Sequence, residues 1–225
     1  MEPTTQTPPT MPSQKIALVT GASRGLGAAL SLVLARDGWH VLAVARTTGA
    51  LEELDDRIQA AGGSATLAPM DVTEPEAMAH LATSVAGRWG GLQLWAHCAV
   101  HAAPLAPAGH IDAKDMTRSI ATNLTATATL VPLIEPLLLA GKGSALFFED
   151  DHAGQKFFGA YGTTKGAQIA LARSWQAETA KIGPRVLIDR PAPMPTATRA
   201  RFFPGEDRAG LADPQAEAER ILALL

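Results

Sequence analysis

Thr20-Gly21-Ala22-Ser23-Arg24-Gly25-Leu26-Gly27 joins a short apolar run to a stretch of helical spacing, and this arrangement decides the fold. The apolar, β-rich run at residues 15–20 predicts a strand, and the apolar spacing that follows predicts a helix over residues 23–37. Glycines let a diphosphate approach the backbone, and the helix N-terminus supplies free N–H groups and a positive dipole end. We therefore predict a nucleotide-binding turn; the alternative is a tight turn that uses glycine for conformation alone.

The rest of the chain repeats this alternation of apolar runs and amphipathic stretches, which is typical of a parallel sheet covered on both faces. Pro132 and Pro136 are expected to kink the long fourth helix. We predict one α/β domain over residues 14–225, a doubly wound Rossmann sheet in three α/β/α layers with strand order 3-2-1-4-5-6. Its further strands are predicted at residues 40–45, 64–68, 92–96, 144–148 and 185–189, and its further helices at residues 50–61, 74–88, 112–140, 158–181 and from 213 onward.

Composition argues against several classes of protein. The 225 residues are 47% hydrophobic and 18% charged with a net charge of −3, and the scattered basic residues argue against a nucleic-acid partner. No uninterrupted apolar run reaches the about 20 residues that span a bilayer, so no membrane segment is expected. The single cysteine, Cys98, cannot form an internal disulfide, which fits a reducing cytoplasm. Residues 1–13 are rich in Pro and Thr, lack the features of a secretory signal and are predicted to form a disordered leader.

The end of the second predicted strand indicates which dinucleotide binds. A site selective for NAD holds the ribose 2′-hydroxyl with an acidic residue at this point, whereas this strand ends Val44-Ala45-Arg46. Arg24 and Arg46 could both form charge-assisted bonds with a 2′-phosphate, so NADP(H) is favoured over NAD(H). The alternative is that both arginines are solvated surface residues.

Tyr161-x-x-x-Lys165, together with the glycine motif, resembles the short-chain dehydrogenase/reductase family over about residues 14–200. The stretches 158–167 and 196–199 are similar to a bacterial branch of YciK-type oxidoreductases. The resemblance implies that Asn123 holds a water in a proton relay to the lysine. It also implies a set of cofactor-binding residues, with Asp71 and Val72 at the adenine and Thr196 at the nicotinamide carboxamide: Gly21, Ser23, Arg24, Gly25, Leu26, Gly27, Arg46, Asp71, Val72, Ala99, Tyr161, Lys165, Pro191 and Thr196.

The Tyr161–Lys165 pair has the spacing of two side chains on one helix face. A neighbouring ammonium stabilises a phenolate, so we expect Lys165 to lower the pKa of Tyr161 from its ordinary value near 10. Tyr161 would then exchange a proton with the oxygen of a small carbonyl or alcohol substrate while the nicotinamide exchanges hydride with its carbon. The alternative is a helical Tyr and Lys without a special role.

Residues 147–154, Phe-Phe-Glu-Asp-Asp-His-Ala-Gly, contain no serine, although the resemblance implies a catalytic serine in this loop. We place Asp151 among the catalytic residues, with Asp150 and His152 as alternatives. An ionised carboxylate beside Tyr161 would raise its pKa and oppose Lys165. A protonated Asp, or His152, would instead donate a hydrogen bond as the serine does, and a solvated acidic turn is the remaining possibility.

Two further departures concern the ends of later strands. Ala96-His97-Cys98-Ala99 stands where the family carries Asn-Asn-Ala-Gly, which places Ala99 against the ribose. His97, Cys98 and His101 lack a clear fourth ligand, so no metal site is predicted. The family's usual seventh strand is missing from the pattern, which argues against a tetramer and leaves a homodimer through the long helices.

These observations lead to a primary hypothesis and an alternative. The primary hypothesis is a cytoplasmic NADP(H)-dependent oxidoreductase that interconverts a carbonyl and an alcohol, with Tyr161, Lys165 and Asn123 in catalysis. The alternative, based on the missing serine and the altered Asn-Asn-Ala-Gly motif, is a catalytically weak dinucleotide-binding protein with a sensing or scaffold role. A binder of apolar ligands without a cofactor is disfavoured by the intact glycine turn.

Overall fold

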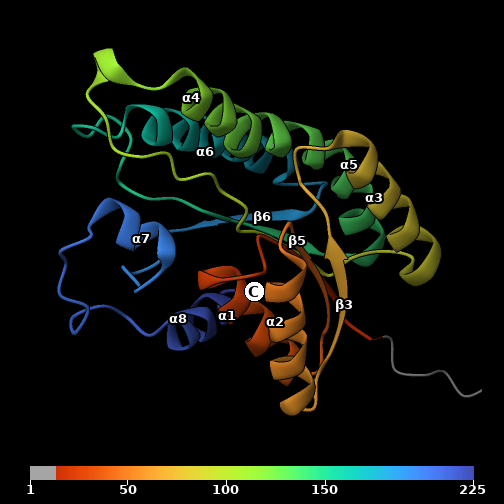
Figure 1. Cartoon of the computed structure of the whole chain (residues 1–225). Coiled ribbons are helices and arrows are strands. Elements are labelled where there is room, and N and C mark those ends of the chain that lie inside the picture. Colours follow the sequence, from red (N-terminus) through yellow and green to blue (C-terminus); the bar gives the residue numbers. More distant parts are fainter. Residues whose placement is uncertain (1–13) are drawn as a thin grey trace, which may run out of the picture.

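A computed structural model describes residues 14–225, so the predicted leader at residues 1–13 lies outside the described residues. Six parallel strands form one sheet in the order β3-β2-β1-β4-β5-β6, which confirms the predicted topology (Figure 1). The chain reverses its direction of travel across the sheet between β1 and β4, the place where doubly wound folds bind their ligands. The strands are β1 (Ile16–Thr20), β2 (His40–Ala45), β3 (Ser64–Pro69), β4 (Leu94–His97), β5 (Ser144–Phe148) and β6 (Arg185–Asp189).

Helices cover both faces of the sheet, as Figure 1 shows. One layer is formed by α1 (Gly25–Arg36), α2 (Thr48–Ala60) and α8 (Pro214–Leu222), and the other by α3 (Pro75–Trp89), α4 (Ala113–Ser119), α5 (Ala126–Gly141) and α6 (Gly159–Thr179). Because both faces are covered, β1, β2 and β4 are buried along their whole length, which explains their uninterrupted apolar sequences. Leu18 and Trp95 pack toward the α3–α6 layer, whereas Val19 and Leu94 pack toward α1 and α2.

The long helix predicted at residues 112–140 is interrupted by a π-helical segment, Ile120–Thr125, between α4 and α5. The helix continues through Pro132 and Pro136, and its departure from α-geometry lies about two to three turns before the first of them. The stretch Ala113–Gly141 is long and apolar enough to cross a membrane by composition alone. In this fold its apolar side chains include Leu130, Ile134 and Leu138, which are buried against the sheet and α3. A core helix passes the same test.

The sequence pattern predicts no element between residues 189 and 213, whereas the structure has a helix there. A short helix, α7 (Ala197–Phe202), begins at Thr196, whose Oγ1 accepts a hydrogen bond from the Arg199 N–H at 3.2 Å. The chain then turns into α8, where the buried Glu217 accepts a hydrogen bond from the Ala192 N–H at 2.8 Å. In the described part of the chain no strand follows β6, in agreement with the predicted six-stranded sheet.

Candidate active site

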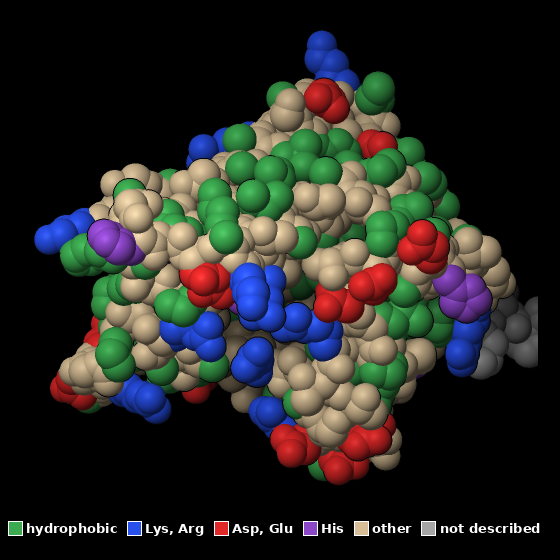
Figure 2. All heavy atoms as spheres, turned by 45° about the horizontal axis from the view of Figure 1, so that its top comes forward, with side chains coloured by type: hydrophobic (Ala, Val, Ile, Leu, Met, Phe, Trp, Pro, Cys, Tyr) green, Lys and Arg blue, Asp and Glu red, His purple; other side chains and the backbone are tan. Residues whose placement is uncertain are grey.

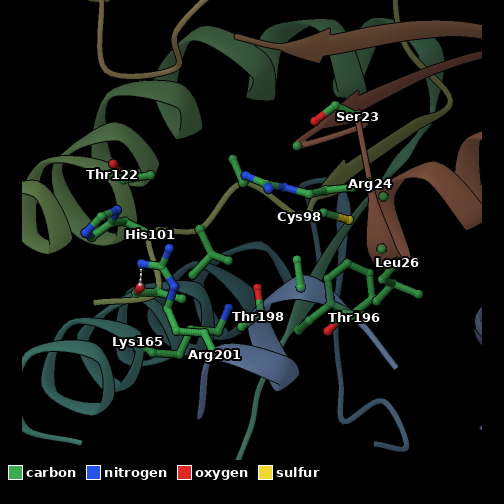
Figure 3. Close-up of a pocket in the computed structure, with 18 of the residues that line it drawn as sticks. Ser23, Arg24, Leu26, Cys98, His101, Thr122, Lys165, Thr196, Thr198 and Arg201 are labelled. Atoms are coloured by element: carbon green, nitrogen blue, oxygen red, sulfur yellow. Dashed lines mark hydrogen bonds between the residues drawn. The ribbon is translucent and has the colours of Figure 1, made fainter. Parts of the chain in front are cut away.

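One pocket of about 560 Å³ opens at the carboxyl ends of β1, β2, β4 and β5, which is the size of a typical small-molecule site. It brings together every cofactor-binding residue predicted from the sequence, from the glycine turn through Asp71, Val72 and Ala99 to Pro191 and Thr196. Figure 3 shows Ser23, Arg24 and Leu26 along one side of this pocket and His101 and Thr122 along the opposite side. Segments up to about 175 residues apart in the sequence therefore line one pocket, and this supports the predicted nucleotide site.

The glycine turn is tightly packed, which explains why glycines occur in it. Gly21 and Gly25 have φ angles of +76° and +55°, a region that side chains disfavour. A Cβ atom on Gly27 would lie 2.3 Å from the Gly21 carbonyl oxygen, and one on Gly21 would lie 2.6 Å from the Ala99 backbone nitrogen. The backbone of the glycine turn is thus in contact with the loop after β4. The first turn of α1 lines the pocket.

We expect Gly27→Ala to lower the free energy of unfolding by about 1–3 kcal/mol, because the added methyl overlaps the Gly21 carbonyl in a region that backbone packing holds. The matched control is Gly49→Ala in α2, where an added Cβ meets no atom within 4 Å. This control should be neutral or stabilising by about 0.5–1 kcal/mol. Urea unfolding followed by tryptophan fluorescence measures both variants, and equal midpoints for the two would contradict the packing argument.

Arginines gather around the pocket, unlike the scattered basic residues that the sequence suggested. Figure 2 shows Lys and Arg side chains grouped around a hollow on one face of the molecule. The pocket lining includes arginines from four different elements: Arg24, Arg46, Arg118, Arg199 and Arg201. Arg46 is 63% exposed and lies 3.7 Å from the Asp71 carboxylate, a loose surface ion pair that a phosphate group could replace. Arg24 and Arg46, the two arginines predicted to face a 2′-phosphate, therefore line the same pocket.

Tyr161 lies in the pocket with its hydroxyl directed at a carboxylate. The Oη atom donates a hydrogen bond to Asp150 Oδ2 at 2.5 Å, and the side chain is only 5% exposed. Burial of the phenol and the nearby Asp150 charge raise the pKa of Tyr161 well above its ordinary value. The expectation that Lys165 lowers this pKa is therefore wrong in this structure, because burial and the carboxylate dominate.

Lys165 lies in the same pocket, but its ammonium contacts a glutamine. Nζ donates a hydrogen bond to Gln168 Oε1 at 2.6 Å, and the side chain is almost completely buried. Burial lowers the pKa of Lys165 to about 8, while the charge of Asp150 opposes this shift. Lys165 thus lines the same pocket as Tyr161, and the group that contacts its charge is a neutral amide.

Asn123 is buried in the π-helical segment, where both ends of its amide form structural hydrogen bonds. Its Oδ1 accepts from the His101 N–H at 2.7 Å, and its Nδ2 donates to the His101 carbonyl at 3.0 Å and to Thr164 Oγ1 at 2.9 Å. The side chain therefore joins the loop after β4 to α6. Its main-chain carbonyl accepts from Gln168 Nε2 at 3.0 Å, so Asn123 is connected to Lys165 through Gln168.

A sequence model of the short chain dehydrogenase family matches residues 15–207. The chain belongs to this family. The short-chain dehydrogenases are oxidoreductases that use a nicotinamide dinucleotide, and the chain is an oxidoreductase of the same family. The predicted family membership is thus confirmed, and it accounts for the sheet order and the glycine turn together.

Three similar proteins place this short-chain dehydrogenase among its relatives. An uncharacterized oxidoreductase from Mycobacterium tuberculosis is 32% identical over 190 residues, covering 83% of this chain and 71% of the relative. The structure of the oxidoreductase YciK from Escherichia coli superposes with a TM-score of 0.81 at 27% identity, covering 89% of this chain and 84% of the other. An alcohol dehydrogenase from Thermococcus sibiricus in complex with 5-hydroxy-NADP gives a TM-score of 0.80 at 25% identity, covering 94% and 90%. A match to the glycine betaine reductase of Emericella nidulans covers 95% of this chain but only 18% of that longer relative.

The path of the loop after β5 decides which of its residues contacts Tyr161. Asp150 lies against Tyr161, and its Oδ1 also accepts a hydrogen bond from the His152 N–H at 3.1 Å. Asp151, which we placed among the catalytic residues, is 62% exposed and pairs with Arg190 at 2.6 Å. This placement was wrong: adjacent residues in an extended loop point in different directions, and here Asp150 points inward.

His97 belongs to a buried hydrogen-bonded chain beneath the pocket. Its Nδ1 lies 2.7 Å from Thr20 Oγ1 and its Nε2 lies 3.0 Å from Thr127 Oγ1. Burial, together with the charge of Lys165, lowers the pKa of His97 to about 3, so the ring is neutral at physiological pH. Burial likewise raises the pKa of the adjacent Cys98 thiol to about 12. His97 thus has a structural role at the end of β4, and the thiol stays protonated.

An aromatic cluster that sequence reasoning missed forms the wall beside Tyr161. The Phe202 ring centroid lies 4.8 Å from that of Tyr161 and 5.0 Å from that of Phe158. His152 stacks on Phe158 at 4.1 Å, and both line or adjoin the pocket. The only signal in the sequence was the pair Phe202-Phe203 after a proline-rich loop, which gives no indication of where the loop folds back.

Proposed function

We propose that this short-chain dehydrogenase is an NADP(H)-dependent oxidoreductase that interconverts a carbonyl and an alcohol, with Tyr161 as the group that exchanges the proton. The observation that supports it most directly is the presence of Tyr161, Lys165 and the glycine turn in one pocket. An aromatic wall made by Phe202 beside Tyr161 favours a substrate with an apolar body next to its reactive oxygen. The cytoplasmic location and the homodimer through the long helices stay predictions.

The residues around the pocket fit a dinucleotide. The glycine turn leaves the N-terminus of α1 accessible, which suits a diphosphate. Arg24 and Arg46 suit a 2′-phosphate, and Asp71 and Val72, which line the same pocket, would hold the adenine. Lys165 and Thr196, which line the same pocket, would hold the nicotinamide half. When bound, the cofactor supplies or accepts the hydride.

The chain's own residues manage the proton. In carbonyl reduction the Tyr161 hydroxyl gives its proton to the substrate oxygen, and in alcohol oxidation the phenolate takes a proton from it. The Asp150 carboxylate accepts a hydrogen bond from the Tyr161 hydroxyl, so it stabilises the protonated phenol. Tyr161 is therefore held in the form that donates a proton, which favours carbonyl reduction over alcohol oxidation at neutral pH.

A binding and turnover experiment tests this proposal. NADPH and NADH are titrated into the full chain by fluorescence, and the reduction of a panel of aliphatic and aromatic ketones and aldehydes is followed by the absorbance of the reduced nicotinamide. We expect tighter binding of NADPH and turnover of at least one apolar carbonyl. Tighter binding of NADH would overturn the cofactor assignment. Binding without turnover of any panel member would favour a catalytically weak dinucleotide-binding protein.

Arg46→Asp is expected to weaken NADPH binding by about 10- to 100-fold while affecting NADH much less, because a charge-assisted bond to the 2′-phosphate is lost and a repulsive carboxylate is introduced. Arg57→Asp on α2 is the matched control, since Arg57 is exposed and lies outside the pocket. Fluorescence titration gives the four dissociation constants. Equal weakening of both cofactors by Arg46→Asp would contradict contact with the 2′-phosphate.

A further inference from the structure

Lys165 is the only one of the six lysines that is not exposed, and its ammonium is held at the inner end of the pocket. A buried ammonium needs hydrogen-bond acceptors to offset the loss of hydration. Of the side chains described by the structure, the one that accepts a hydrogen bond from Nζ is Gln168, one helical turn further along α6, at 2.6 Å. Gln168 is itself completely buried.

The orientation of the Gln168 amide is set by groups on the opposite side. Its Nε2 donates to the Asn123 carbonyl at 3.0 Å and to Thr127 Oγ1 at 2.9 Å, and both partners belong to the long helical stretch that packs on α6. A flipped amide would place its NH2 group against the ammonium and its oxygen against the Asn123 carbonyl, which is doubly unfavourable. The oxygen of Gln168 therefore faces Lys165.

A buried network extends from this amide beneath the whole pocket. Thr127 Oγ1 donates to the Asn123 carbonyl at 3.1 Å and lies 3.0 Å from His97 Nε2, and the other nitrogen of His97 lies 2.7 Å from Thr20 Oγ1. The network thus connects α6 with the ends of β4 and β1. Each member is buried and bonded, which restricts the rotamers that Gln168 can adopt.

We propose that Gln168 is the positioning residue of Lys165: it anchors the ammonium in its charged form at the place where the proposed function needs a cation. The inference rests on the proposed function, which assigns Lys165 to the nicotinamide half of the pocket. The other titratable groups near Lys165 are Asp150 in the loop after β5, His97 and Cys98 at the end of β4, and Tyr161 on its own helix. Gln168 contributes no net charge, so its effect is that of a hydrogen bond to a charged donor.

Titration of the lysines by NMR tests the role of Gln168 without requiring turnover. Full-length protein labelled with ¹³C at lysine Cε is titrated with pH in the absence of cofactor, and Lys165 is assigned with Lys165→Arg. Gln168→Leu is expected to raise the acid dissociation constant of Lys165 by about tenfold or more, because a hydrogen bond to the charged form is lost. Gln168→Glu is expected to lower it by about tenfold or more, because a carboxylate replaces the amide.

The control is Gln176→Leu on the same helix, where the Gln176 side chain donates a hydrogen bond to the Val186 carbonyl and lies about three turns away from Lys165. It should leave the titration of Lys165 unchanged. Should Gln168→Leu fail to fold, the nearly isosteric Gln168→Glu decides the question. An unchanged dissociation constant for Lys165 in the folded Gln168 variants would overturn the proposal.

The result is separable from the proposed function. If both Gln168 variants shift the acid dissociation constant of Lys165 but the protein binds neither NADPH nor NADH, the role of Gln168 is supported and the proposed function is contradicted. If the protein reduces carbonyls with NADPH but neither variant shifts the acid dissociation constant of Lys165, the proposed function is supported and the role of Gln168 is contradicted. If both proposals hold, Gln168→Leu also moves the pH dependence of NADPH binding in the same direction as the titration of Lys165.

Discussion

Tyr161→Phe is expected to lower kcat for carbonyl reduction by about 10²- to 10⁴-fold, with little change in the dissociation constant for NADPH. The substitution removes only the hydroxyl that transfers the proton, and general acid catalysis contributes an effect of this size. The ring would still pack against Phe202 and Phe158, so the wall of the pocket is retained. Steady-state kinetics on a ketone turned over by the unaltered protein, combined with fluorescence titration of NADPH, measures the two quantities separately.

The variant also loses the hydrogen bond to Asp150, which leaves that carboxylate without this donor in a partly buried place, so the fold must be checked separately. Thermal unfolding of Tyr161→Phe checks that the fold persists. His152→Ala is a useful comparison, since it removes a neighbouring ring of the same wall without touching the hydroxyl. If Tyr161→Phe retains most of its turnover, another group transfers the proton and the proposed assignment is wrong.

Asp150→Ser is expected to lower the pKa of Tyr161 toward its ordinary value and to accelerate alcohol oxidation at a fixed pH below that pKa. Oxidation needs the phenolate, and the fraction of phenolate rises about tenfold for each unit by which the pKa falls. The variant removes the charge that raises the pKa of Tyr161, although the effect of burial remains. The acidic limb of the pH profile for oxidation therefore moves to lower pH.

Tyr161 is the only tyrosine in the chain, so its ionisation can be followed directly by the ultraviolet absorbance of tyrosinate as the pH is raised. This spectroscopic titration requires neither substrate nor cofactor. Asp151→Ser serves as the control, because Asp151 pairs with Arg190 on the surface and does not contact Tyr161. The interpretation fails if Asp150→Ser leaves the tyrosinate titration where it is in the unaltered protein, or if Asp151→Ser shifts it by the same amount.

The presence of six strands and the position of the glycine turn could be predicted from the linear pattern. Apolar runs at regular intervals predicted six buried strands, and the glycine spacing in residues 20–27 placed the turn between β1 and α1. The interval of four residues between Tyr161 and Lys165 likewise placed both on one face of α6. In each case the signal is local, since it depends on the geometry of one strand, one turn or one helix.

The partners of the reactive side chains depend on contacts between distant segments. Asp150, Asp151 and His152 are consecutive, and only the path of the loop after β5 decides that the first of them contacts Tyr161. The sequence gives only a weak indication of Gln168, which is a polar residue among buried positions of α6 such as Ile169 and Ala172. Its hydrogen-bond partners Asn123 and Thr127 lie more than 40 residues away in the sequence. Hydrogen bonds act over about 3 Å, whereas sequence spacing specifies neighbours only within one element. The fold class therefore follows from periodicity, while the protonation of Tyr161 and Lys165 follows from packing.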